Sequence, residues 1–474
     1  MVKVLLINPP LSKNELYARG SEESASILPP LGLAYVAAVL EKAEHSVEVI
    51  DGIAEDISLE EIGKRTIGFD AIGIISLTAF ALRSHQTAAE VKKNSDVPVI
   101  MGGPHPTAIP FEVIKDSNVD YVVVGEGEYT FLELVDNLMD KHKIKDILGL
   151  VYRDEKGVVV FNGSRPLLQN IDELPYPALH LFPMEKYKNS EIRSARQPAL
   201  SIMTSRGCAF GCTFCNKKIF GKRFRAHSAK RVVDEIEWLM KEFGAKQIAI
   251  WDETFTLDRQ RVVDICDMII ERGLDIPWDC ATRVNCVDYE LMKKMKQAGC
   301  ESISYGIESG SERVIKSINK GFTKQQVVDA INDTRRVGIE TRAYFMLGLV
   351  GETMDDMKQT IRFAKMIKPD YASFTLLVPH PGTEEYEKAL KEGEFDDHFW
   401  DKIVLPEYNF LEKPVYVPKG MTASQLLKMH MKAYKSFYFS PYTIFKILAS
   451  IRSMNDVKRI FIGVKTMLKA EVKS

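Results

Sequence analysis

The sequence has little cysteine and no long apolar run. Seven cysteines occur among 474 residues, and none precedes Cys208. A secreted disulfide scaffold is therefore excluded, because such proteins are small and cysteine-dense. No apolar stretch approaches the ~20 residues that span a bilayer, and residues 1–10 are too short an apolar run for a signal peptide. We therefore expect a cytoplasmic protein with reduced thiols.

The chain also lacks an excess of charge of either sign. Its formal net charge is -2, which argues against nucleic acid as a partner. Hydrophobic residues at 45% and charged residues at 27% are ordinary for a globular protein. The length allows two to four domains with ample buried core.

A glycine fingerprint for dinucleotides is missing from the first 140 residues. Short apolar strands alternate there with helices, which predicts a doubly wound parallel sheet covered on both faces. The predicted strands are 2–7, 47–50, 71–75, 97–101 and 121–124, and the predicted helices are 31–40, 59–66, 84–92 and 111–115. No Gly-x-Gly-x-x-Gly follows the first strand, which argues against a nicotinamide or flavin domain.

Polar residues and glycines follow these strands, where doubly wound folds bind their ligands. Ser76, Leu77 and Thr78 follow the third strand, and Gly102 and Gly103 follow the fourth. Paired glycines let a flat ligand approach the backbone, and hydroxyls can donate to a phosphate or sugar. Each group alone is also typical of an ordinary turn.

Two further features lie at these strand ends. Residues 125–128, Gly-Glu-Gly-Glu, follow the fifth strand. His105 stands between two prolines, and we expect it to shape its loop or contact a ligand rather than bind a metal.

Three of the seven cysteines lie within eight residues, in the order Cys208, Cys212 and Cys215. Closely spaced thiolates favour an iron-sulfur cluster or zinc. A four-iron cluster held by three cysteines leaves one iron open for chemistry. Structural zinc needs four protein ligands, and the nearest candidate is His227, twelve positions beyond Cys215. The spacing therefore favours the cluster over zinc.

The strand-helix alternation resumes around the cysteines. Strands are predicted at 200–204, 247–250, 278–281, 302–306, 340–346 and 371–377, with helices between them such as 229–242 after a Ser228 N-cap. Six such units predict a partial (β/α)6 barrel of TIM type, whose chemistry gathers at the carboxyl ends of its strands. The cysteine loop follows the first of these strands.

Other strand ends of the barrel also carry candidate binding residues. They are Asp252 and Glu253 after the second strand, Arg283 after the third, Glu308 after the fourth and Gly348 after the fifth. We expect Glu352 to be a charge near a helix start rather than a ligand. The remaining cysteines share no spacing and receive no role: Cys266, Cys280, Cys286 and Cys300.

The spacing Cys-x3-Cys-x2-Cys, with Phe214 before the last cysteine, resembles the signature of the radical S-adenosylmethionine (SAM) superfamily. The resemblance implies a 4Fe-4S cluster on the three cysteines, with Phe214 beside it, whose open iron binds SAM. An electron from a flavodoxin- or ferredoxin-type donor then releases a 5'-deoxyadenosyl radical. It also implies that Asp252 and Glu253 bind the SAM ammonium, Arg283 the carboxylate, Glu308 the ribose and Gly348 the adenine.

The amino-terminal loops resemble the cobalamin-binding domain of cobalamin-dependent radical SAM enzymes. In that resemblance the run Ser76-Leu77-Thr78 lies beside the nucleotide tail, and Gly102 and Gly103 admit the dimethylbenzimidazole. Residues 8–27 contain no histidine, so the Asp-x-His-x-x-Gly lower ligand is absent. The cobalt would then have no protein imidazole below it.

We divide the chain into four parts. These are a cobalamin-binding domain at 1–140, a connecting hairpin and linker at 141–195, a radical SAM barrel at 196–385 and a helical basic region at 386–474. The hairpin is predicted from strands at 149–153 and 158–161 around a turn.

The carboxyl-terminal region is basic. From Met421 onward ten lysines or arginines stand against two acidic residues. Residues 442–451 and 460–468 mix apolar side chains with lysine, which is typical of an interfacial helix attracted to anionic lipid. The alternative is a pair of helices that cap the barrel with their lysines in solvent.

Together the two resemblances predict a methyltransferase that acts on an unactivated carbon of a small-molecule or lipid-like substrate. The layout also resembles the anaerobic magnesium-protoporphyrin monomethyl ester cyclase, so radical ring formation is an alternative. A non-catalytic corrinoid or metal carrier is a third, although the intact cysteine motif argues against it. Methylthiotransferases need cysteines in the amino-terminal domain, and this chain has none there.

Overall fold

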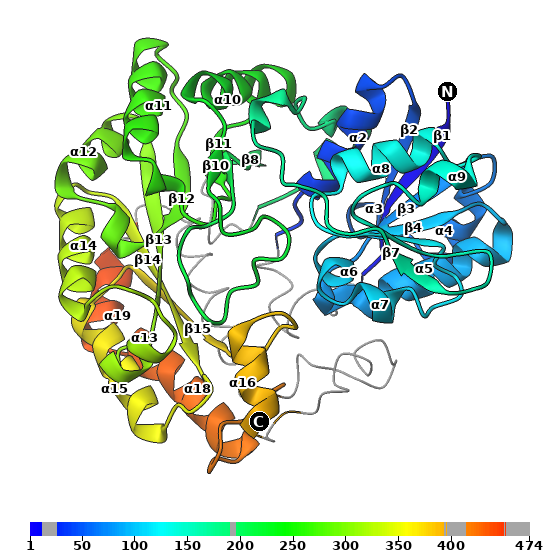
Figure 1. The fold of residues 1–474 in the computed structure, drawn as a ribbon. Coiled ribbons are helices and arrows are strands. Elements are labelled where there is room, and N and C mark those ends of the chain that lie inside the picture. Colours follow the sequence, from blue (N-terminus) through cyan, green and yellow to red (C-terminus); the bar gives the residue numbers. More distant parts are fainter. Residues whose placement is uncertain (12–25, 190–195, 393–394, 396–413, 450, 452–474) are drawn as a thin grey trace.

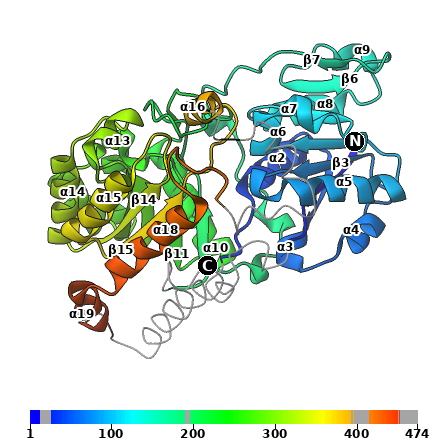
Figure 2. The same cartoon turned by 90° about the horizontal axis from the view of Figure 1, so that it is seen from below.

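Two sheets organise the chain in the computed structural model (Figures 1 and 2). The structure describes residues 1–11, 26–189, 196–392, 395, 414–449 and 451. The predicted segment 460–468 and most of the loop after the first strand lie outside these ranges.

The amino-terminal sheet has the strand order β2-β1-β3-β4-β5-β6-β7. The first five strands are parallel: β1 (Lys3–Asn8), β2 (Ser46–Asp51), β3 (Ala71–Ile75), β4 (Val99–Gly102) and β5 (Tyr121–Val123). The predicted hairpin forms β6 (Leu150–Arg153) and β7 (Val159–Phe161), which join the edge at β5 in antiparallel pairing. The doubly wound prediction is confirmed, but the sheet is mixed rather than wholly parallel.

Helices cover both faces of this sheet because its strands are apolar on both sides. In β1, Val4 and Leu6 pack with α2 (Leu31–Lys42) and α8 (Glu128–Asp136). Leu5 and Ile7 point to the opposite face and pack with α4 (Leu59–Arg65) and α5 (Ala81–Asn94). The shorter helices are α3 (Gly52–Glu55), α6 (Pro104–Ala108), α7 (Pro110–Val113) and α9 (Lys141–Ile144).

The second sheet contains six parallel strands in the order β15-β14-β13-β12-β11-β8. They are β8 (Ala199–Ile202), β11 (Gln247–Ile250), β12 (Trp278–Thr282), β13 (Cys300–Glu308), β14 (Glu340–Leu347) and β15 (Tyr371–Leu376). The helices between them include α10 (Ala229–Phe243), α11 (Arg259–Glu271), α12 (Tyr289–Gln297), α14 (Lys324–Arg336) and α15 (Met354–Ile367). The sheet curves with these helices outside (Figure 1). The partial barrel is confirmed.

A short antiparallel pair closes the loop that carries the three cysteines. β9 (Ser205–Arg206) pairs with β10 (Arg225–Ala226), so residues 207–224 leave and return at one neck. Gly207 has φ +81, and a Cβ there would lie 2.3 Å from the Arg223 carbonyl oxygen. The neck therefore requires glycine at this position.

The carboxyl-terminal helices extend the barrel. α18 (Ala423–Tyr438) covers β15, where the Tyr434 and Tyr438 hydroxyls donate to the carbonyls of Phe374 and Ala372 at 3.0 and 2.9 Å. α19 (Pro441–Ala449) continues beyond the barrel (Figure 2), and α16 (Glu384–Glu392) precedes both. Within the described ranges, none of the helices combines the length and apolarity needed to cross a bilayer.

Candidate active site between the two sheets

The three clustered cysteines are half-buried, and all seven cysteines of the chain are free thiols. The Cys208 sulfur lies 3.6 Å from the Thr254 hydroxyl, and the Arg283 guanidinium donates to the Cys212 sulfur at 3.3 Å. Burial, with the nearby Glu253 carboxylate, raises the pKa of Cys215 to about 11 although Lys217 opposes the rise. This thiol therefore keeps its proton until a metal displaces it.

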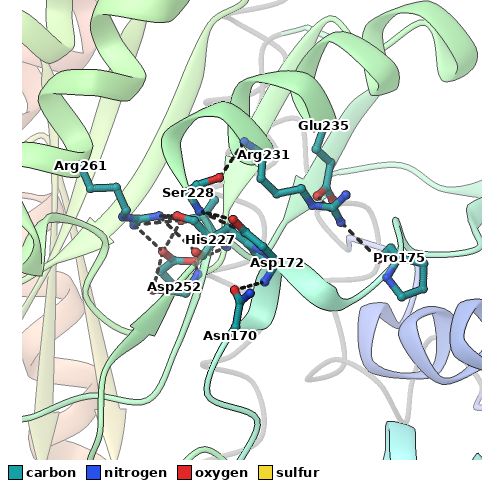
Figure 3. Close-up of polar contacts among 11 residues, drawn as sticks. Asn170, Asp172, Pro175, His227, Ser228, Arg231, Glu235, Asp252 and Arg261 are labelled. Atoms are coloured by element: carbon teal, nitrogen blue, oxygen red, sulfur yellow. Dashed lines mark hydrogen bonds and ion pairs between the residues drawn. The ribbon is translucent and has the colours of Figure 1, made fainter.

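This set of donors fits a cluster better than a single zinc ion. Three thiolates can bind three different irons of a cluster without converging on one point. In the described part of the chain, no three His, Cys, Asp or Glu side chains lie close enough together to hold a single metal ion. His227, the proposed fourth zinc ligand, bonds Asp172 at 2.8 Å instead (Figure 3), and burial lowers its pKa to about 4.

Asp252, predicted to bind the SAM ammonium, lies at the end of β11 and is buried. It accepts hydrogen bonds from the backbone and hydroxyl groups of Thr204 and Ser205, at 2.5 to 3.0 Å. The Arg261 guanidinium adds an ion pair at 3.6 Å (Figure 3). Both carboxylate oxygens are therefore engaged in tying β11 to the start of the neck.

The neighbouring Glu253 has a different environment. Its side chain lies close enough to Cys215 to raise the pKa of that thiol. Burial, reinforced by the charge of Asp252, raises the pKa of Glu253 itself. A carboxylate in such a setting gains from a cationic ligand, because the cation offsets its desolvation.

Arg283, predicted to bind the SAM carboxylate, bridges the end of β12 and the cysteine loop. Besides Cys212, its guanidinium donates to the Lys320 carbonyl oxygen and stacks on the Phe210 ring at 3.7 Å. The arrangement holds the cysteine loop against the barrel.

Glu308, predicted to bind the ribose, ends β13 with a left-handed φ of +67. Its carboxylate accepts a bond from Lys320 Nζ at 2.7 Å in a buried pair. A Cβ on Gly306 would lie 2.6 Å from that carboxylate, so Gly306 leaves the space for the pair.

Gly348, predicted to admit the adenine, has φ +79 and packs against Leu426 of α18. Its backbone N–H donates to Glu352 at 2.6 Å, as does that of Leu349 at 3.1 Å. Glu352 thus closes the turn before α15, which is capped by Thr353. Burial raises the pKa of Glu352 to about 8, and within the described residues its other oxygen has no hydrogen-bond partner. Our expectation of an ordinary charge near a helix start missed this burial.

The cobalamin-type residues meet at the carboxyl edge of the amino-terminal sheet. Ser76 is fully buried, and among the described residues its hydroxyl finds no partner. Gly103 has φ +109, and a Cβ there would come within 3.0 Å of the Ser76 carbonyl oxygen. At Gly102 a Cβ would meet only an ordinary contact. Leu77 is exposed, and Thr78 begins a short helix at 78–80.

An orphaned hydroxyl beside a glycine that brings two backbones together is a suitable cradle for a polar group of a ligand. His105 is buried in the same loop, and burial lowers its pKa to about 3. A cavity of about 520 Å³ opens nearby, with Thr107, Val124 and Lys218 in its lining. Lys218, three residues beyond Cys215, donates to the Ala108 carbonyl oxygen at 3.0 Å. The cysteine loop therefore touches the amino-terminal domain beside this edge.

Sequence reasoning missed several residues that shape the site. Thr254 next to Cys208, Phe210 under Arg283 and Lys320 beside Glu308 are examples. Phe210 lies between Cys208 and Cys212, and Thr254 directly follows Glu253, so both stand beside residues that the sequence had marked as candidates. Lys320 lies twelve residues from Glu308 and carries no such signal.

Two family models match the chain, the B12 binding domain at residues 21–135 and the radical SAM superfamily at residues 202–364. An uncharacterized methyltransferase of Pyrococcus horikoshii is 40% identical over 452 residues, which is 94% of each chain. The chain belongs to the cobalamin-dependent radical SAM enzymes.

A further relative and a solved structure are similar to the chain at lower identity. The anaerobic magnesium-protoporphyrin IX monomethyl ester cyclase of Rubrivivax gelatinosus is 28% identical over 93% of this chain and 78% of its own. The solved structure of TsrM, a radical SAM methyltransferase from Kitasatospora setae, shares the fold with a TM-score of 0.69. It is 20% identical and covers 83% of this chain and 76% of that one.

Membership makes this chain an enzyme that uses a 4Fe-4S cluster, SAM and cobalamin. It requires a substrate and an electron donor. The carrier alternative is thereby set aside.

Proposed function

We propose that this cobalamin-dependent radical SAM enzyme is a methyltransferase that methylates an unactivated sp3 carbon of a small-molecule or lipid-like substrate. Its main support is the 40% identity to the uncharacterized methyltransferase of Pyrococcus horikoshii over 94% of each chain. The cysteine loop contacts the amino-terminal domain beside the cobalamin-type edge, through Lys218 and Ala108, and this contact supports a reaction that needs both cofactors near one substrate.

An unactivated carbon has no acidic proton, so a general base cannot make it a nucleophile. When bound, the cluster and one SAM would supply a radical that removes hydrogen, and cobalamin would supply a methyl group that a second SAM replaces. The protein positions these groups and excludes water from them. Cys208, Cys212 and Cys215 would hold the cluster, with Phe214 beside it.

For SAM we assign the ammonium to Glu253, because the carboxylate of Asp252 is already engaged by the chain. Arg283, Glu308 and Gly348 stay predicted contacts for the carboxylate, the ribose and the adenine. For cobalamin we assign the nucleotide tail to the run Ser76-Leu77-Thr78, and we assign its dimethylbenzimidazole to Gly102 and Gly103.

Isotope transfer from SAM tests the proposal. The protein is purified anaerobically with added cobalamin, its cluster is reconstituted, and SAM with a deuterated methyl group is added with a reductant. Extracts of metabolites and lipids from cells that lack the gene serve as the substrate source. We expect one extract component to gain the labelled methyl group and 5'-deoxyadenosine to form with it.

Cyclisation is the second candidate, supported by the similarity to the Rubrivivax cyclase over 93% of the chain. The same experiment separates the two reactions. A product that loses hydrogen and carries no label, formed with 5'-deoxyadenosine, would refute methylation and favour an oxidative ring closure.

We further propose a flavodoxin- or ferredoxin-type protein as the electron donor. Reduced ferredoxin and reduced flavodoxin are each expected to sustain 5'-deoxyadenosine formation without a chemical reductant. No formation with either protein, while a chemical reductant still works, would refute this assignment.

We also propose that the enzyme works in the cytoplasm at the surface of an anionic membrane. α19 and the residues around it expose large apolar side chains, of which Phe445 is 72% and Leu448 61% exposed. Lys428 and Lys432 of the preceding helix are exposed as well. From Met421 onward the chain has ten basic and two acidic residues, and this positive charge complements anionic lipid.

Co-sedimentation with vesicles tests this contact. We expect binding to vesicles with phosphatidylglycerol at low salt, and weaker binding to pure phosphatidylcholine. The double variant Phe445→Ser/Leu448→Ser should lose most of the binding while it keeps its cluster. Equal sedimentation of the wild type with both vesicles, or none with either, would contradict the proposal.

A further inference from the structure

Four charged side chains form an ion-pair array between the cobalamin-binding domain and the neck of the cysteine loop. We propose that Glu126 and Glu128 of this array are positioning residues that set the place of the cluster relative to cobalamin. The proposal concerns both cofactors, so it holds whether the substrate is methylated or cyclised.

The array links the segment after β5 to both strands of the neck. Arg206 on β9 donates to Glu126 at 3.0 Å and to Glu128 at 2.6 Å. Arg225 on β10 donates to both oxygens of Glu126 at 2.8 Å. One guanidinium thus spans two carboxylates, and one carboxylate spans two guanidinium groups.

Neighbouring groups fix the array further. The Leu168 backbone N–H donates to Glu126 at 3.0 Å, and its carbonyl oxygen accepts from Arg225 at 2.8 Å. The Arg206 guanidinium lies between the rings of Tyr35 and Phe220, at 5.5 and 5.4 Å from their centroids. Tyr35 belongs to α2 of the cobalamin-binding domain and Phe220 to the cysteine loop.

The array is buried. The side chains of Arg206 and Arg225 are each 2% exposed, and those of Glu126 and Glu128 are 9% and 8% exposed. Buried ion pairs add little stability over apolar packing, because desolvation offsets their attraction. The guanidinium and carboxylate groups can hydrogen-bond fully to one another only in a narrow range of geometry. This array therefore specifies the orientation of the cobalamin-binding domain relative to the neck of the cysteine loop.

Each end of the array leads directly to a cofactor site. Arg206 and Arg225 bracket residues 207–224, and Cys208 follows Arg206 by two positions. On the other side, Glu126 follows β5, which pairs with β4. The Gly102 and Gly103 bend is at the end of β4, so the cobalamin edge and the segment that carries the carboxylates follow neighbouring strands of one sheet.

The double variant Glu126→Gln/Glu128→Gln tests the array in the holoenzyme. Both substitutions lie far in sequence from the cysteines and keep the side-chain volume. The matched control is Asp234→Asn/Glu237→Gln, which removes two carboxylates that share Arg272 on the surface of the barrel alone.

Pulsed electron paramagnetic resonance between the reduced cluster and Co(II) cobalamin reports their separation. We expect a narrow distance distribution in the wild type and the control. In the double variant the distribution should broaden or shift while iron, sulfide and corrinoid contents stay unchanged. An unchanged narrow distribution in the double variant would overturn the proposal.

Hydrogen exchange gives a second readout that does not depend on cobalamin. In protein without added corrinoid, the double variant should exchange the neck amides 205–208 and 223–226 about tenfold faster, and the control should not. Arg206→Lys keeps the charge but cannot span two carboxylates, so it should act in the same direction. Exchange at the wild-type rate in both variants would refute the positioning role of the array, whether or not the enzyme transfers a methyl group. If methyl transfer is not observed, this exchange test still applies.

Discussion

The two sheets present comparable carboxyl edges, but their polar groups are engaged differently. At the cobalamin-type edge the buried Ser76 hydroxyl lacks a partner among the described residues. At the barrel edge Asp252, Glu308 and Arg283 already bond groups of the chain itself. The first edge keeps a polar group available for a ligand, whereas much of the second holds the cysteine loop and its supports in place. The type of a polar residue at a strand end therefore says little about its role until its hydrogen-bond partners are known.

Of the changes that test the difference between the two edges, the loss of one cluster ligand should have the largest effect on activity. Cys208→Ala is expected to lose the cluster and all 5'-deoxyadenosine formation, because two thiolates do not hold it. Iron and sulfide analysis and chromatography of the SAM products measure both. Cys286→Ala is the matched control, since Cys286 is a half-buried thiol outside the loop. Retention of cluster and cleavage in Cys208→Ala would refute the assignment of the loop.

Asp252→Asn should lower the unfolding free energy of the protein, because it disrupts the hydrogen bonds at the barrel edge. The substitution leaves Arg261 buried without its carboxylate and replaces an acceptor oxygen by a donor beside Thr204. We expect a loss of about 3 kcal/mol in the unfolding free energy, measured by urea denaturation under anaerobic conditions. Asp234→Asn, on the surface, should change it by less than about 0.5 kcal/mol. If Asp252→Asn instead keeps full stability and weakens only SAM binding, Asp252 is a ligand residue.

Lowering the pH should reduce the unfolding free energy of the protein, because His227 is protonated more easily in the unfolded chain. Burial lowers its pKa from 6.5 to about 4 in the folded state, so the unfolded chain binds the proton more tightly. The contribution is complete above pH 6.5 and is lost as the pH falls toward 4, by up to about 3 kcal/mol. Urea denaturation across this range should show a shallower pH dependence in His227→Gln. An identical slope in both proteins would contradict the burial argument.

Ser76→Ala should have the smallest effect on stability and activity. It is also the most direct test of the cobalamin-type edge. Removal of a buried hydroxyl without a partner should leave stability unchanged or slightly higher. Cobalamin affinity should fall about tenfold, the value of one hydrogen bond, as followed by absorbance titration. Thr87→Val serves as the control, because it removes a buried hydroxyl that bonds only its own helix. Unchanged affinity in Ser76→Ala would remove Ser76 from the cobalamin site.

The sequence was sufficient for the fold because its strands are marked by local apolar runs. The predicted strands 71–75 and 247–250 have the bounds of β3 and β11. β13 begins and ends two residues beyond its prediction, because Cys300 and Glu308 also pair with neighbouring strands. The site was less predictable. Asp252 bonds groups 47 and 48 residues away, and such partners leave no local pattern.

The ion-pair array was hidden for the same reason. Glu126 and Arg206 are 80 positions apart in the chain, and each is an ordinary charged residue in its own segment. The glycines around Glu126 suggested a ligand loop, whereas its carboxylate is directed to the other domain. Local sequence patterns therefore predicted which residues lie at the strand ends, whereas the structure was needed to find the partners of their side chains.

The neck at β9 and β10 also has a thermodynamic consequence. Its arginines are held by the cobalamin-binding domain, and its loop carries the cluster ligands, so the two cofactors share one structural element. If both cofactors bind more tightly to the docked arrangement, their affinities are linked, because bound cluster then raises the affinity for cobalamin by the same factor by which bound cobalamin raises the affinity for the cluster. Loss of the cluster would then weaken corrinoid binding, and loss of the corrinoid would weaken cluster binding by that same factor.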